Sequence, residues 1–172
     1  MFKALMLAGL LICAPVAAAA QEGGPTDPQI AHIAYTAGLL DVTAAEQALA
    51  KSTNPAVRAF ADEMVRDHKA VNEAAIALVT RLNVTPEANS ISAGLSEQAA
   101  ATHARLALLE GADFDRAYVA NEVAYHQAVN DALGVTLIPG AHNPELKSLL
   151  ETGLVLFREH QAHAEHLAME LR

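Results

Sequence analysis

Three pairs of residues, each an aspartate or asparagine followed by proline, divide this sequence into helices. Such a pair is typical of a helix start, because the polar side chain can accept free N–H groups and proline is tolerated in the first turn. The pairs are Asp27-Pro28, Asn54-Pro55 and Asn143-Pro144. Each precedes a long run with apolar residues at three- and four-residue spacing, and no segment alternates with the period of a strand. These signals predict helices at about 28–52, 55–83 and 144–171.

The part between the second and last of these helices holds a shorter helix and another long one. After a segment rich in turn formers, we expect helices at about 94–110 and 114–134, separated by Gly111-Ala112-Asp113 and closed by Gly134, Pro139 and Gly140. Short connections join the long helices in two hairpins, and a longer crossover joins the hairpins. The expected fold is therefore all-α, a ferritin-like four-helix bundle with a short extra helix before the third long helix.

The first residues have the features of an export signal. Lys3 precedes an apolar stretch, and a run of alanines ends at Ala20, so we expect a cleaved signal peptide at residues 1–20. A flexible leader at 21–27 and a single bundle domain at 28–172 would follow. This predicts a periplasmic protein with no membrane insertion after cleavage. The one cysteine, Cys13, falls within the signal, which leaves no thiol chemistry.

Charge and motifs exclude several classes of function. The chain has 11 Lys and Arg against 20 Asp and Glu, a net charge of −9, and no basic patch with interleaved aromatic residues. Nucleic acid is therefore not an expected partner. The sequence also lacks a phosphate-binding glycine loop and a Ser/His/Asp arrangement. A protein partner is not identified by any motif.

Three histidines occupy positions of the apolar repeat where a bundle would normally have leucine. They are His68, His126 and His160, one on each of three predicted long helices. A buried imidazole needs a hydrogen-bond partner or a metal ion. Two acidic residues, Asp41 and Glu122, occupy equivalent positions on the first and third long helices. Every long helix thus contributes at least one ionisable residue to the predicted core.

The hairpin geometry predicts that these residues lie at one height. Asp41 and His68 are equally distant from the turn at Thr53-Asn54 to within about one residue, or ~1.5 Å. His126 and His160 agree to within a few residues across the second hairpin. If the two hairpins align, Asp41, His68, Glu122, His126 and His160 form one group. Imidazole and carboxylate ligands suit a transition metal such as Fe, Zn, Cu or Mn.

Two interpretations of this group remain open at the level of sequence. It could bind a metal ion, or the Asp41–His68 and Glu122–His126 pairs could satisfy one another by hydrogen bonding in a non-catalytic interaction or envelope-stress module. Enzymatic activity is the less favoured expectation. Carboxylate-bridged di-iron proteins use Glu-x-x-His motifs, but Val65 and Phe157 stand three residues before His68 and His160.

Two sequence boxes carry a resemblance to a known family. The box MVxDH spans Met64 to His68, and the box FDxxYxxxxxxxH spans Phe114 to His126. On these motifs the chain resembles DUF4142, an exported bacterial domain of unknown function, over essentially everything after the signal. The resemblance implies a ferritin-like fold and places all three core histidines on recurrent histidines of the family. Asp41 stands where relatives usually have glutamate, and the family has no established activity.

Overall fold

The computed structural model describes residues 23–171, and these residues form helices and connections without any strand. The helices are α1 (Asp27–Lys51), α2 (Pro55–Arg81), α3 (Ser90–Ala107), α4 (Gly111–Ala132), the π-helical turn η1 (Leu133–Leu137), α5 (Ile138–Gly140) and α6 (Pro144–Glu170). The all-α prediction is confirmed. The predicted signal peptide and the first two residues of the leader lie outside the described residues.

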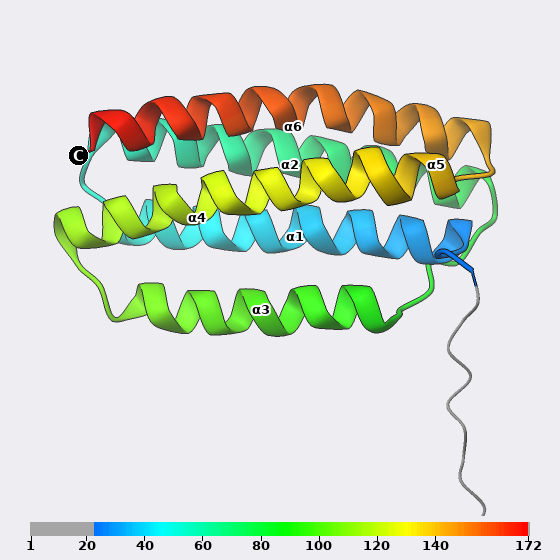
Figure 1. Ribbon diagram of the computed structural model, residues 1–172, viewed down its shortest axis with the longest axis horizontal. Coiled ribbons are helices and arrows are strands. Elements are labelled where there is room, and N and C mark those ends of the chain that lie inside the picture. Colours follow the sequence, from blue (N-terminus) through cyan, green and yellow to red (C-terminus); the bar gives the residue numbers. More distant parts are fainter. Residues whose placement is uncertain (1–22, 172) are drawn as a thin grey trace, which may run out of the picture.

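Two helical hairpins pack side by side to form the body of the molecule. α1 pairs with α2, α4 pairs with α6, and α2 also packs against α6. α3 lies outside this bundle against α1 and carries the chain back along its length, so that α4 runs parallel to α2 (Figure 1). The chain therefore runs through α1 and α2, crosses over through α3, and returns through α4 and α6.

Asparagine side chains cap two of the long helices as predicted. Asn54 and Asn143 each accept hydrogen bonds from the backbone N–H groups two and three positions later. The first helix differs, since its N-cap is Thr26 and Asp27 is already helical. The Asp27 carboxylate instead accepts the backbone N–H groups of His142 and Asn143, both at 2.8 Å, and ties the start of α1 to the start of α6.

The boundaries of the middle helices differ from the prediction. α3 begins at Ser90 instead of about 94, because the Asn89 side chain accepts two N–H groups in its first turn. At the other boundary, Gly134 does not end the third long helix. The backbone continues through η1, where the N–H of Ile138 donates to the carbonyl of Leu133, and stays helical to Gly140. Leu133 is buried in the core, which holds this wider turn in place.

A polar layer divides the core into two apolar clusters. One cluster, around Phe60 and Phe114, includes residues from the ends of α1 and α6 and the starts of α2 and α4. The other, around Leu78 and Phe157, lies toward the opposite end of the bundle. On each long helix the ionisable residues identified from the sequence fall between the members of these two clusters.

Gly38 allows α1 and α2 to approach each other closely beside this layer. A Cβ atom on Gly38 would lie 2.3 Å from the side-chain oxygen of Asn72, which is itself buried. Asp41 lies almost one turn after Gly38, and His68 one turn before Asn72. The absence of a side chain at position 38 therefore sets the helix separation at the polar layer.

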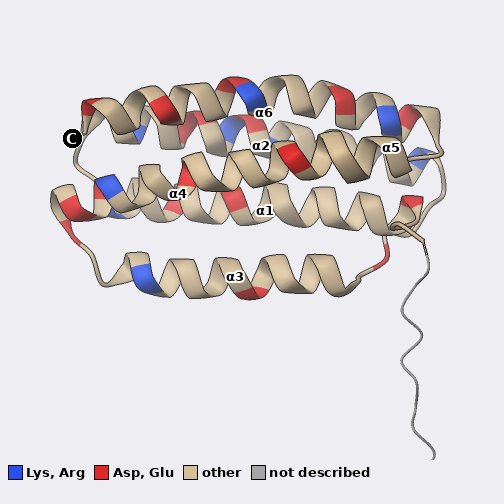
Figure 2. Ribbon diagram, viewed as in Figure 1, with Lys and Arg blue, Asp and Glu red and all other residues tan. Residues whose placement is uncertain are grey.

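Charged side chains are unevenly distributed over the helices. Figure 2 shows acidic and basic residues along α2 and α6, whereas Glu97 and Arg105 are the only such residues of α3. Among residues 23–171, none of the helices combines the length and apolar character needed to span a bilayer.

Candidate metal centre

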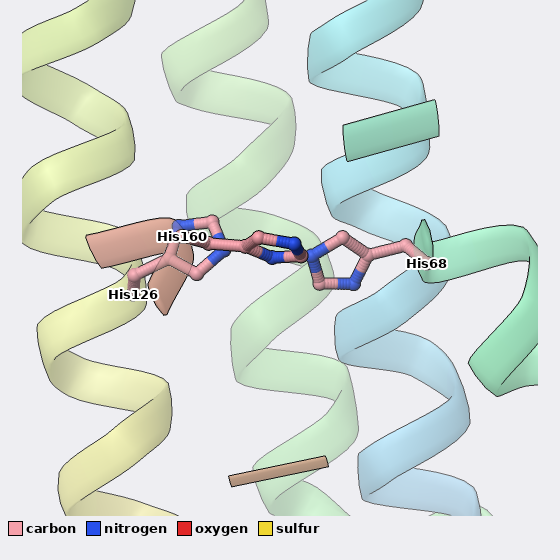
Figure 3. A group of neighbouring side chains, drawn as sticks. All are labelled: His68, His126 and His160. Atoms are coloured by element: carbon pink, nitrogen blue, oxygen red, sulfur yellow. The ribbon is translucent and has the colours of Figure 1, made fainter. Parts of the chain in front are cut away.

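The three core histidines meet at the centre of the bundle. His68 on α2, His126 on α4 and His160 on α6 point toward one another (Figure 3), each with only 1–2% of its surface exposed. Their ring centroids are 5.6 Å apart for His68 and His126, and 5.4 Å apart for each of the two other pairs. One nitrogen from each ring can be chosen such that all three lie within 4.8 Å of one another.

The two core carboxylates lie against this histidine group. Asp41 Oδ2 is 3.6 Å from His68 Nε2 and also 3.6 Å from His126 Nε2. Glu122 Oε2 is 3.7 Å from His126 Nδ1, and Asp41, Glu122 and His126 offer ligand atoms within 4.8 Å of one another. All five residues predicted from the sequence are thus neighbours in one buried group, with the two hairpins aligned at its height.

The two expected ion pairs do not satisfy themselves by hydrogen bonding. The Asp41–His68 and Glu122–His126 side-chain distances of 3.6 and 3.7 Å exceed hydrogen-bond length. His126 Nδ1 lies instead 3.0 Å from the backbone oxygen of Glu122, to which it donates, and this leaves Nε2 as a lone-pair nitrogen facing the group. Both nitrogens of His68 also have no hydrogen-bond partner, and both oxygens of Asp41 and one oxygen of Glu122 have none apart from a hydrogen bond between the two carboxyls.

His160 is held by an aspartate that the sequence analysis did not select. Its Nε2 lies 3.1 Å from Asp67 Oδ2, while its Nδ1 is buried without a partner. Asp67 also accepts two hydrogen bonds from Arg66, and these lower the pKa of its carboxyl further than His160 does. An ionised carboxylate on the far nitrogen orients an imidazole and makes its other nitrogen a better metal ligand.

Asp67 was not predicted as a site residue because it lies about 100° around the helix from His68, outside the apolar repeat. Its position beside His68 in the MVxDH box was the one available signal. Asp67 also belongs to a second set of possible ligands that lies nearer the surface. In this set Glu63, Asp67 and His160 offer atoms within 4.8 Å of one another. There Glu63 Oε2 accepts a hydrogen bond of 2.7 Å from His163 Nδ1.

Burial controls the charge of the imidazoles. Desolvation lowers the pKa of His68 well below its usual value, and the neighbouring His126 and His160 add to this shift. Desolvation also lowers the pKa of His126 to about 4. It lowers the pKa of His160 less strongly, because Asp67 favours the charged form of that ring. Near neutral pH the rings are therefore neutral, which is the form that binds metal ions.

Burial has the opposite effect on the acids. Desolvation raises the pKa of Asp41 to about 7, with Glu122 partly opposing. Desolvation and the charge of Asp41 raise the pKa of Glu122 well above its usual value. The same two charges, after burial, raise the pKa of the Tyr118 hydroxyl, which is buried without a partner one turn before Glu122. Burial therefore shifts both acids toward their neutral form, and a hydrogen bond between the two carboxyls requires a proton on one of them.

The spacing of the donor atoms suits a single small cation. Ligands about 2.0–2.1 Å from a tetrahedral ion lie roughly 3.3–3.4 Å apart. Asp41 Oδ2 is 3.6 Å from two histidine nitrogens, so small side-chain movements would bring it into that range. Phe157 stacks on His68 with centroids 4.7 Å apart and limits rotation of that ring. In residues 23–171 this group has two carboxylates, fewer than a carboxylate-bridged di-iron centre uses.

Comparison with known proteins places the chain in a family. Searches of curated proteins and of solved structures gave no match. The profile of one family, described as Domain of unknown function (DUF4142), matches residues 13–167, which include all five residues of the buried group. The chain therefore belongs to the DUF4142 family.

Proposed function

We propose that this protein binds one divalent transition-metal ion at the centre of its bundle, through His68, His126, His160 and Asp41, with Glu122 beside them. The observation that carries the proposal is a set of buried ligand atoms from four helices: they form two groups that share His126, and within each group the atoms lie within 4.8 Å of one another. Buried polar atoms are normally hydrogen-bonded, and leaving one unpaired costs about 1–3 kcal/mol. A single ion removes several of these costs together.

The donor set favours a borderline cation. Three neutral imidazoles and a carboxylate suit Zn²⁺, Fe²⁺ or Cu²⁺ better than Ca²⁺ or Mg²⁺, which prefer oxygen ligands alone. The Asp67–His160 contact of 3.1 Å supports this assignment, since metal-binding histidines usually donate their other N–H to a carboxylate or carbonyl. His126 follows the same pattern with the backbone carbonyl of Glu122.

The proposal includes the type of bundle and the compartment. The crossover through α3, which leaves α4 parallel to α2, supports a ferritin-like arrangement. The sequence of residues 1–20 supports export to the periplasm. An exported metal-binding bundle would act there as a metal-binding protein or in envelope stress.

Elemental analysis tests the proposal. Protein without a histidine tag is purified, exchanged into metal-free buffer and measured beside a His126→Leu variant. A matched control is His142→Leu, because the His142 side chain is 89% exposed. We expect close to one ion per chain in the wild type and the control, and loss of the ion in His126→Leu with helical circular dichroism retained. A metal-free wild type that also takes up none of added Zn²⁺, Fe²⁺, Cu²⁺ or Mn²⁺ would overturn the proposal.

A further inference from the structure

A cavity of about 490 Å³ extends from the space under α3 into the core of the bundle. Its size lies within the range of about 300–1,000 Å³ usual for small-molecule sites. α3 contributes Leu95 and Ala99 to its outer wall, and α6 contributes Leu150 and Phe157 to its inner wall. Most of the lining is apolar, so this space suits a hydrocarbon better than water.

Small side chains on two helices leave this space open. Ala124, Ala128 and Ala132 follow one another at four-residue spacing on α4, and all three line the cavity. Ala34 and Gly38 line it on α1. Ala124 and Ala128 are exposed to solvent, so the cavity has an opening on the side of α4. The Tyr125 hydroxyl bridges α4 to α1 with a 2.8 Å hydrogen bond to the carbonyl of Ala37.

The inner part of the cavity borders two acids. Asp41 and Glu122 belong to its lining, are 1–2% exposed, and present three buried oxygens whose one hydrogen-bond partner is the other carboxyl. No lysine or arginine is among the lining residues. Burial disfavours the ionised form of these acids; a cationic head would stabilise that form, whereas an anionic head would add a like charge at this end of the cavity. The lining therefore matches a molecule with an apolar body and a cationic, hydrogen-bond-donating head.

The length of the cavity limits the apolar body. Its lining on α1 extends from Ala31 to Ala44, and the ten residues from Ala31 to the carboxylate-bearing Asp41 are ~15 Å of helix. This is comparable to an extended dodecyl chain. A chain of that length would lie along the alanine-rich walls and place its head at the carboxylates.

We propose that this cavity binds a long-chain aliphatic amine, with the alkyl chain under α3 and the ammonium group on Asp41 and Glu122. The inference goes beyond the metal proposal and does not require it, because the cavity and the acids exist without an ion. An ammonium group and a metal ion both need the Asp41 oxygens, so the two cations compete. Metal binding is measured without amine, and amine binding in chelator-treated protein, so failure of one proposal is distinguished from failure of the other.

Calorimetric titration with dodecylamine, below its micelle concentration, tests this inference on the full bundle. Dodecanoate, which has the same chain and an anionic head, is the matched ligand. We expect one amine to bind per chain and dodecanoate to bind on the order of tenfold more weakly or worse. Replacing both acids in an Asp41→Asn/Glu122→Gln variant should weaken amine binding by a similar factor. Added Zn²⁺ should raise the apparent dissociation constant of the amine.

A second pair of variants locates the site. Ala128→Phe fills the opening of the cavity, whereas Ala120→Phe places the same side chain at an exposed position of α4 outside the lining. Both keep the net charge, so they control for unspecific attraction of a cationic amphiphile to an acidic protein. Amine binding should be lost in the first and retained in the second. Equal binding of amine and acid, an unchanged affinity after replacing the two carboxylates, or equal binding by the two phenylalanine variants would each overturn the proposal.

Discussion

Replacing His68 by leucine separates a metal ligand from a structural histidine, because the two roles predict opposite changes in stability. Both ring nitrogens of His68 are buried without a partner in the metal-free protein. Each unpaired polar group costs about 1–3 kcal/mol. Leucine has a similar volume and no polar atom, but it loses the stacking on Phe157, worth about 0.5–1.5 kcal/mol. In chelator we therefore expect His68→Leu to be as stable as the wild type, or more stable by about 1–3 kcal/mol.

The metal-bound protein should respond in the opposite direction. An ion at a hundred times its dissociation constant stabilises a folded protein by about 2.7 kcal/mol. For a chain of this size, a change of 1 kcal/mol shifts Tm by about 2–4 °C, so we expect Zn²⁺ to raise the wild-type Tm by about 5–11 °C. His68→Leu should lose most of this increase, because one of four ligands is gone.

The assay is thermal and chemical unfolding followed by circular dichroism, with and without chelator. His166→Leu is the matched control, because the His166 side chain is 68% exposed on α6. It should keep the Zn²⁺-dependent shift. The reasoning is refuted if His68→Leu in chelator is destabilised by more than about 2 kcal/mol and the wild type shows no shift with Zn²⁺. That result would make His68 a histidine required for packing.

Three further predictions concern pH, helix contact and the orientation of a ligand. In chelator, the lowered pKa of His126, about 4, makes the unfolded chain bind protons more readily. Stability should therefore fall as pH decreases from ~6.5 to about 4, by about 3 kcal/mol from this residue. The pKa of Asp41 is raised to about 7, so the folded protein binds this proton more tightly than the unfolded chain, and acidification through this range adds stability. Asp41→Asn removes this contribution and should make the free energy of unfolding fall more steeply with decreasing pH, as measured by denaturant titrations across pH. Gly38→Ala should cost about 1–3 kcal/mol and lower metal affinity, because its Cβ would press on the Asn72 amide. Asp67→Asn should weaken metal binding about 10–100-fold, measured by competition with a chelating dye.

Matched variants define what would contradict these expectations. Asp62→Asn changes an exposed acid of the same helix and should leave metal affinity unchanged, so equal effects of the Asp62 and Asp67 variants would count against an orienting role. For pH, a His126→Leu variant should lose less stability on acidification than the wild type, and an identical profile would refute the assignment. For the helix contact, Ala74→Gly should cost only about 1 kcal/mol by helix propensity and spare metal affinity.

Much of the fold follows from local signals that the chain carries along its length. Asn54-Pro55 and Asn143-Pro144 begin helices because their caps need only residues two and three positions away. The two helix boundaries that were predicted wrongly, at Asp27 and Gly134, depend instead on contacts between residues distant in sequence. Asp27 looks like a cap, but its carboxylate is taken by His142 and Asn143, which are more than a hundred residues away in sequence. Gly134 looks like a helix end, yet packing of Leu133 carries the helix through it as a π-helical turn.

The residues of the candidate site could be predicted from local sequence, whereas their arrangement could not. Helical periodicity placed Asp41, His68, Glu122, His126 and His160 on core faces, and equal distances from the turns placed them at one height. The sequence by itself therefore determined which residues could meet. Only the tertiary structure decided that the hairpins align, that Asp67 holds His160, and that alanines on α1 and α4 leave a cavity beside the acids. These features depend on the angle and separation between helices, which arise from contacts between side chains distant in sequence and have no period in it.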